Sequence, residues 1–136
     1  MRYIPFGVPR FEDLGLPDVI GTLAREERGI ILVTGTTGSG KSTTLASMLN
    51  LVNHSAAKHI VTIEDPIEFL HRNDKSIINQ REVGAGTASY TRALRRVLRQ
   101  DPDILICAEV AKRDGRIVSW TTHFQEKPQT GAKEDV

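Results

Sequence analysis

The segment Gly35–Ser42 reads GTTGSGKS and matches the pattern G-x-x-x-x-G-K-[ST] at every fixed position. Glycines let such a loop turn tightly, so that successive backbone N–H groups point inward at phosphate oxygens. In this pattern Lys41 reaches the β- and γ-phosphates, and the Ser42 hydroxyl is a ligand for Mg²⁺. The plainer interpretation is a glycine-rich turn that only joins a strand to a helix. Such a turn does not require every fixed position of the pattern, so the complete match favours nucleotide binding. The predicted nucleotide-binding residues are Gly35, Thr36, Thr37, Gly38, Ser39, Gly40, Lys41, Ser42 and Thr43.

Acidic residues end two other apolar runs of the chain. Glu64 ends HIVTIE, and Glu109 ends ILICAE. Ligands bind outside the carboxyl ends of the strands in an open α/β sheet, so we expect both carboxylates beside the phosphate loop. There a carboxylate ligates Mg²⁺ through water, or orients and deprotonates an attacking water. We predict Glu64 and Glu109 as catalytic and Ser42 and Glu109 as Mg²⁺ ligands. The alternative for each carboxylate is a loop cap that faces solvent.

Four arginines fall at helical spacing within residues 87–100, namely Arg92, Arg95, Arg96 and Arg99. The plain interpretation is a solvated helix face. The sharper one is a subunit interface, at which an arginine contributes to the nucleotide site of a neighbouring subunit. Nucleic acid ranks third, because no aromatic residues are interleaved and the net charge is only +1.

Three short apolar runs, at residues 30–34, 59–63 and 104–108, are expected to form the strands that position these residues. Runs without polar alternation are typical of strands buried on both faces of a parallel sheet. Residues 75–83 are expected to hold a further short strand. Between the first two runs, Leu45, Met48, Leu49 and Val52 recur at helical spacing, which predicts a βαβ unit. Another helix is expected within residues 14–29, with Pro17 in its first turn.

The composition describes a globular chain of 136 residues, with 39% hydrophobic and 26% charged residues. No apolar run approaches the roughly 20 residues that span a bilayer, so we expect no transmembrane segment. The single cysteine, Cys107, is expected to be a small core residue in a reducing compartment. The histidines lack metal-ligand spacing, and we assign no metal other than nucleotide-bound Mg²⁺.

Five segments in succession resemble a known family. LGLPDVI, GIILVTGTTGSGKSTTLASMLN, HIVTIEDPIEF, INQREVG and TRALRRVLRQDPDILI are similar to the type II/IV secretion ATPases, and among them to the type IV pilus retraction, or twitching-motility, ATPases (PilT type). The resemblance is dense from about residue 5 to Glu109. It implies an α/β fold of the P-loop NTPase (RecA-like) class, in which helices flank a parallel sheet that is incomplete at its C-terminal side.

The resemblance also implies a function. Members of this family are hexameric motors at the cytoplasmic face of the bacterial inner membrane, where ATP hydrolysis drives pilus disassembly through a platform protein. Glu64 would lie in the family's acidic box, and Glu109 would be the glutamate that activates water or holds Mg²⁺. Arg81 and the arginines of the 92–99 helix would lie near subunit or nucleotide contacts. ATP and Mg²⁺ are the implied substrate and cofactor.

The chain departs from the family pattern after Glu109. The sequence here is AEVAKRD, in which the Arg-Asp pair is displaced by two positions, and Gly86 replaces an acidic residue. We therefore expect a lead-in at 1–15, the front part of an ATPase core at 16–110, and a divergent, poorly ordered tail at 111–136 with a short β-like patch from Arg116 to Trp120. A truncated motor of this kind is expected to expose apolar surface and to aggregate.

Three functions remain open from the sequence. The first is an ATP-hydrolysing motor domain of the pilus-retraction type. The second is a nucleotide-binding fragment without turnover of its own. The third, a small P-loop kinase, is disfavoured because no arginine-rich lid or acceptor-binding segment is visible in the sequence.

Overall fold

Nine elements follow one another in the described part of the chain. The computed structural model describes residues 4, 7–36, 38–84, 90–113 and 116–125, and beyond Ala108 it describes the backbone alone. The elements are η1 (Phe11–Leu14), α1 (Asp18–Ala24), β1 (Gly29–Gly35), α2 (Lys41–Ser55), β2 (His59–Glu64), β3 (Ile77–Glu82), α3 (Tyr90–Leu98), β4 (Ile104–Arg113) and β5 (Arg116–Gln125).

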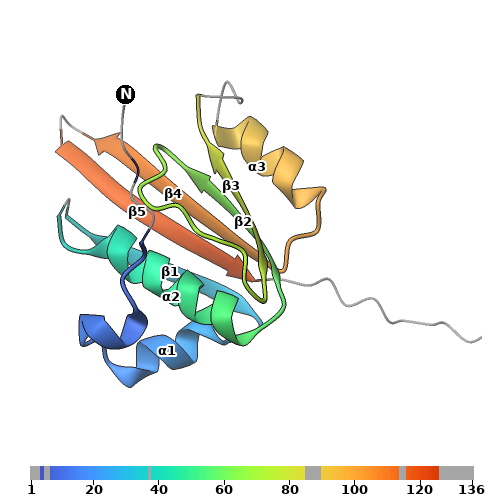
Figure 1. Cartoon of the computed structure of the whole chain (residues 1–136). Helices are drawn as coiled ribbons and strands as arrows, with labels where there is room; N and C mark the ends of the chain where they lie inside the picture. The colour runs from blue at the N-terminus through green and yellow to red at the C-terminus, as the bar shows by residue number, and fades with distance from the viewer. Residues whose placement is uncertain (1–3, 5–6, 37, 85–89, 114–115, 126–136) are drawn as a thin grey trace, which may run out of the picture.

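The strands form one sheet in the order β1-β5-β4-β2-β3 (Figure 1). β2 pairs in parallel with both β3 and β4. β5 pairs antiparallel with both β4 and β1, so β1 to β4 all run in one direction and β5 alone runs against them. The predicted α/β fold with a parallel sheet and flanking helices is confirmed, with β5 as the one antiparallel strand among those described.

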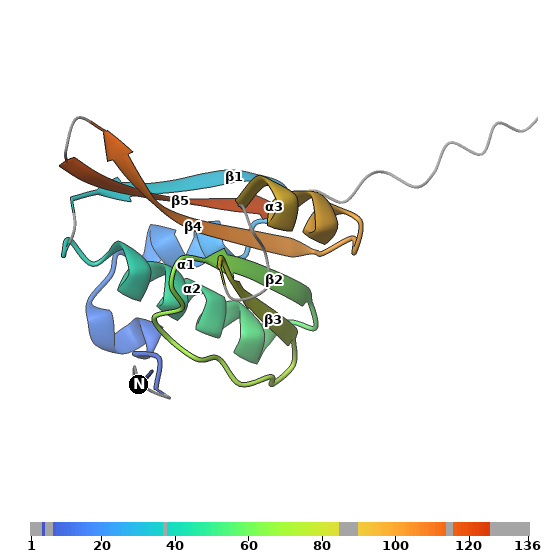
Figure 2. The ribbon, with the colours of Figure 1, turned by 90° about the horizontal axis from the view of Figure 1, so that it is seen from above.

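Helices cover both faces of this sheet (Figure 2). α1 and α2 lie on one face, where Met48, Leu49 and Val52 pack with Ile60 and Ile106 in one core cluster. α3 lies on the other face, where its Ala93 and Val97 pack against a second cluster from β2 and β4. Alternate residues of β2 and β4 therefore enter opposite clusters, as the 2.0-residue period of a strand requires.

The helix after the phosphate loop begins where the sequence predicts. Gly40 precedes α2 with φ of +92°, a left-handed conformation that glycine adopts without steric cost. The four predicted apolar positions of α2, Leu45, Met48, Leu49 and Val52, are all buried. Burial of this stripe against the sheet fixes the direction of α2, and with it the place of the loop at its N-terminus.

The N-terminal segment is more structured than an extended lead-in. It contains the 3₁₀ helix η1, and the Phe11 side chain of η1 packs against the core cluster under α1 and α2. Pro17 stands at the N-terminus of α1, as predicted. The helix ends at Ala24, well inside the expected range of 14–29, and Leu23 is exposed on its surface.

The prediction that the first apolar run is buried on both faces is wrong. Ile30 and Leu32 of β1 are 58% and 63% exposed, whereas Ile31 packs against the core cluster on the other face. Ile30 and Leu32 are exposed because α3 does not cover β1. The core cluster on the α3 face joins α3 to β2 and β4 and includes no residue of β1. The exposed apolar surface that the sequence predicts is therefore present.

Replacing Leu32 with threonine should reduce self-association of the chain. Threonine is β-branched, which suits a strand, and an exposed substitution of this kind changes the free energy of unfolding by about 0.5 kcal/mol or less. Light scattering of the purified chain should show less aggregate for Leu32→Thr, whereas the control Ile31→Thr should lower the stability. Equal aggregation of Leu32→Thr and the unmodified chain would contradict an adhesive role for this face.

The chain after Glu109 contains more regular structure than its sequence predicts. β4 continues to Arg113, and β5 extends the short β-like patch to Arg116–Gln125, between β4 and β1. β-branched and aromatic residues are frequent in β5, and the edges of β1 and β4 offer it hydrogen-bonding partners. Residues 126–136 lie outside the described part of the chain.

Candidate functional site

The phosphate loop joins the end of β1 to the start of α2, as its pattern predicts. Its lysine folds over the loop, where the Lys41 Nζ donates hydrogen bonds to the carbonyl oxygens of Gly35 at 2.7 Å and Thr36 at 2.6 Å. The Ser39 hydroxyl also donates to the Thr36 carbonyl, at 2.6 Å. Although Lys41 is charged, only 7% of it is exposed. The ammonium group therefore lies within the curve of the loop.

The first glycine of the pattern has a steric reason. A Cβ atom at Gly35 would lie 2.6 Å from the Ser39 hydroxyl oxygen, and the φ of +156° is strained for other residues. No larger residue fits there while Ser39 keeps its position. Thr36 and Gly38 to Gly40 complete the loop, and Ser42 and Thr43 lie in the first turn of α2. The predicted Thr37 lies outside the described residues.

Glu64 stands at the carboxyl end of β2, half-buried. Its Oε2 accepts hydrogen bonds from the Thr62 hydroxyl at 2.8 Å and from the Gln80 amide at 3.1 Å. Burial raises the pKa of Glu64, and these two hydrogen bonds work against that rise, while the nearby Glu68 and Glu82 carboxylates add to it. Such an environment is common for carboxylates that take part in proton transfer or ligand binding.

Glu64 and Ser42 meet in one small cavity of about 60 Å³ beside the N-terminus of α2. The helix N-terminus carries a partial positive charge, which favours an anion at this place. Hydroxyl and carboxylate oxygens line the cavity and are the donors that Mg²⁺ prefers, so its chemistry fits that ion. Its polar lining residues are Ser42, Thr62, Glu64, Asp65, Glu68 and His71.

The other predicted residues are not placed in this cavity. Glu109 lies in β4, in register with Trp120 of β5, and its side chain lies outside those described. The neighbouring Ala108 lines the cavity. None of the described residues that line it is an arginine, and the arginines of α3 stand exposed on the helix over the opposite face of the sheet. Arg81 is half-buried in β3.

Two amides that organise the site carry no recognisable motif in the sequence. Asn53 of α2 is 2% exposed and holds the loop between β2 and β3, and Gln80 of β3 holds the Glu64 carboxylate. Their partners lie 9 to 23 positions away in the chain, so no local spacing marks them. The one sequence signal for Asn53 was its polar side chain within a helix stripe that is otherwise apolar.

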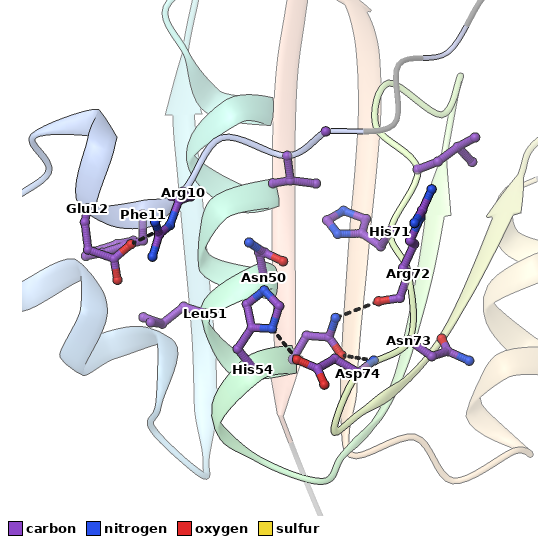
Figure 3. A pocket seen from close by; sticks show the side chains of 14 residues that line it. Arg10, Phe11, Glu12, Asn50, Leu51, His54, His71, Arg72, Asn73 and Asp74 are labelled. Atoms are coloured by element: carbon purple, nitrogen blue, oxygen red, sulfur yellow. Dashed lines mark hydrogen bonds and ion pairs between the residues drawn. The ribbon is translucent and has the colours of Figure 1, made fainter.

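A second, larger cavity of about 1000 Å³ lies at the other end of α2 (Figure 3). The N-terminal segment, the last turns of α2 and the loop between β2 and β3 surround it, and His54 pairs with Asp74 across one side. Among the described lining residues, it shares only His71 with the smaller cavity. Because the phosphate loop lies at the opposite helix end, the candidate nucleotide site is this loop, and the smaller cavity beside Ser42 has room for an ion rather than for a nucleotide.

The family model described as "Type II/IV secretion system protein" matches residues 13–122. This match covers most of the chain and runs past Glu109, where the sequence resemblance was expected to end. The chain belongs to the type II/IV secretion system protein family.

Two relatives show where in this family the chain stands. The twitching motility protein of Neisseria gonorrhoeae is 45% identical over 133 residues, which are 90% of this chain and 36% of the relative. The type IV pilus retraction ATPase PilT of Pseudomonas aeruginosa is 44% identical over 140 residues, which are 95% of this chain and 41% of the relative. The chain therefore spans about two fifths or less of their length.

A solved structure of the pilus retraction motor PilT with bound ADP has the same fold over the shared part. It superimposes with a TM-score of 0.77 at 50% identity and covers 84% of this chain, which corresponds to 33% of that motor. The expected family and fold are confirmed by these matches.

In the described part of the chain, no helix is both long and apolar enough to cross a membrane. The described residues also hold no cluster of three His, Cys, Asp or Glu arranged for a metal ion.

The stability of the chain should fall between pH 6.5 and pH 4 because of His71. Burial lowers the pKa of His71 to about 4, and its Nδ1 has no hydrogen-bond partner among the described residues. The unfolded chain takes up this proton near pH 6.5, so the stability present above that pH is lost as the pH falls toward 4. After allowance for partial exposure of the His71 ring, the free energy of unfolding falls by about 2 kcal/mol over this pH range.

Urea unfolding at pH 7 and pH 4.5 measures this effect. We expect His71→Gln to lose less stability between the two pH values than the unmodified chain does, because glutamine does not titrate. Glu64 acts in the opposite direction, since its raised pKa makes the folded state hold the proton more tightly as the pH falls. An identical loss in both proteins would show that His71 is not the group responsible.

Proposed function

We propose that this chain carries the nucleotide-binding part of an ATP-hydrolysing motor of the pilus-retraction type. The observation that supports the proposal is the cavity shared by Ser42 and Glu64, beside a phosphate loop that Lys41 closes. The similarity to PilT with bound ADP is in agreement with it. The described residues offer no comparable support for a kinase function.

Different groups of the loop would contact different parts of a bound nucleotide. Backbone N–H groups of Gly35–Ser42 and the N-terminus of α2 bind phosphate oxygens, and Lys41 balances their charge. The Ser42 hydroxyl would hold Mg²⁺, together with Glu109 if its side chain reaches the cavity. Mg²⁺ would supply charge neutralisation at the phosphates. Glu64 would orient water or a hydrated ion through its carboxylate.

The proposal extends to the whole motor in the terms of the family resemblance. A hexamer at the cytoplasmic face of the inner membrane would act on a pilus platform protein, with Arg81, Arg92, Arg95, Arg96 and Arg99 near subunit contacts. The proposed division of the chain remains a lead-in at 1–15, an ATPase core at 16–110 and a divergent segment at 111–136.

Phosphate release from ATP by the purified chain tests the proposal. Phosphoryl transfer depends on positioning by the complete site, and the chain spans about two fifths or less of its relatives, so we expect nucleotide binding with turnover near background. Steady turnover that Lys41→Ala and Glu109→Gln abolish would show a self-sufficient motor domain instead. If neither ATP nor ADP changes the melting temperature, the chain does not bind nucleotide and the proposal fails.

A further inference from the structure

Gln80 lies on β3, directly opposite Thr62 of β2 in the parallel register. The two side chains converge on the same carboxylate oxygen, because both donate a hydrogen bond to Oε2 of Glu64, at 2.8 Å from Thr62 and 3.1 Å from Gln80. Glu64 follows Thr62 by two positions on β2 and therefore faces the same side of the sheet. One oxygen of Glu64 is thus held by two donors from neighbouring strands.

The amide of Gln80 is itself held by the loop that follows Glu64. Its Nε2 also donates to the Phe69 carbonyl at 2.7 Å, and its Oε1 accepts the backbone N–H of His71 at 2.9 Å. The partners settle the orientation of the amide, since two acceptors face its nitrogen and one donor faces its oxygen. Three hydrogen bonds leave the Gln80 side chain little freedom to rotate.

We propose that Gln80 is a positioning residue that holds Oε2 of Glu64 and leaves Oε1 for the ligand in the cavity shared with Ser42. This inference rests on the proposed function. Gln80 acts through Glu64, and it is not among the residues that line the cavity. Residues that hold a ligating carboxylate from behind typically change metal affinity about 10- to 100-fold when they are replaced.

The Mg²⁺ dependence of ADP binding measures this role. Fluorescent ADP is titrated into the full chain with Mg²⁺ and with a chelator, and the ratio of the two affinities is compared between variants. We expect Gln80→Leu to reduce this ratio about tenfold while the affinity without Mg²⁺ stays unchanged. Asn79→Leu is the matched control, since Asn79 is exposed on the same strand and contacts His59 instead.

A double-mutant cycle separates positioning from general loss of structure. If Gln80 acts through Glu64, Gln80→Leu has no further effect on the ratio in a Glu64→Gln background. A structural role alone would give additive losses in both backgrounds, with the affinity lowered equally with and without Mg²⁺. That result would overturn the inference.

A measurement without nucleotide keeps the inference distinct from the proposed function. In the NMR spectrum of the chain, the Gln80 side-chain amide protons should exchange slowly and should shift when Glu64 is replaced by glutamine. If the chain binds no nucleotide, the proposed function fails, and this spectrum still decides whether Gln80 holds Glu64. Fast exchange of these protons, or no shift in Glu64→Gln, would show that the contact is absent.

Discussion

Replacing Lys41 with methionine should weaken the binding of ADP or ATP at least about 100-fold, which corresponds to about 2.7 kcal/mol. Charge-assisted hydrogen bonds to a phosphate are each worth about 1.5–3 kcal/mol, and Lys41 is the cation that the loop encloses. Methionine keeps a long apolar stem at a position that is 7% exposed, so the variant removes the ammonium group without opening a cavity.

Fluorescence titration with a labelled ADP gives the affinity, and circular dichroism confirms that the variant is folded. The matched control is Lys75→Ala, which also removes one positive charge, at an exposed position away from the loop. The control should bind ADP as the unmodified chain does. Equal affinity of Lys41→Met and the unmodified chain would show that the nucleotide does not bind at this loop.

Replacing Asn53 with alanine should have the largest effect on stability. The Asn53 amide nitrogen donates to the Arg72 carbonyl at 2.7 Å, and its Oδ1 accepts the backbone N–H groups of Asp74 at 3.1 Å and Ser76 at 3.3 Å. Alanine would leave these backbone groups without their partner in a region where Ser76 is 1% exposed. Each buried polar group left unsatisfied costs about 1–3 kcal/mol, so we expect a loss of about 3 kcal/mol.

Thermal unfolding should show this loss as a fall in the melting temperature of about 10 °C. Asn50→Ala is the matched control, because Asn50 lies one turn earlier on the same helix and makes none of these three bonds. If Asn53→Ala unfolds at the same temperature as the control, the loop after β2 does not depend on this amide. Because the loop joins Glu64 to Gln80, we also expect Asn53→Ala to weaken Mg²⁺-dependent ADP binding.

The sequence predicted the parts of the fold that depend on local pattern. Leu45, Met48, Leu49 and Val52 were expected on one face of a helix and are buried there, and Cys107 is a core residue. The phosphate loop was found because its chemistry requires fixed residues at fixed spacing. Helix periodicity and motif spacing are properties of contiguous residues, which is why they could be predicted without coordinates.

Features that depend on distant pairing could not be predicted in this way. β5 pairs with β1, more than 80 positions earlier, and nothing in either segment specifies that partner. An apolar run such as β1 shows that a strand forms, but its exposure depends on how far α3 reaches across the sheet. Gln80 lies in a strand that the sequence predicted, and its role appears only when β3 is placed beside β2.

An NMR titration of the isotope-labelled chain with ADP and Mg²⁺ tests the central claim most directly, because it reports where the phosphates bind. We predict saturable shifts that are largest at the backbone amides of Gly35–Ser42, with smaller shifts at Glu64, and their loss in Lys41→Met. The contradicting result is an unperturbed loop at saturating ADP, or largest shifts around the cavity at Asn50–His54.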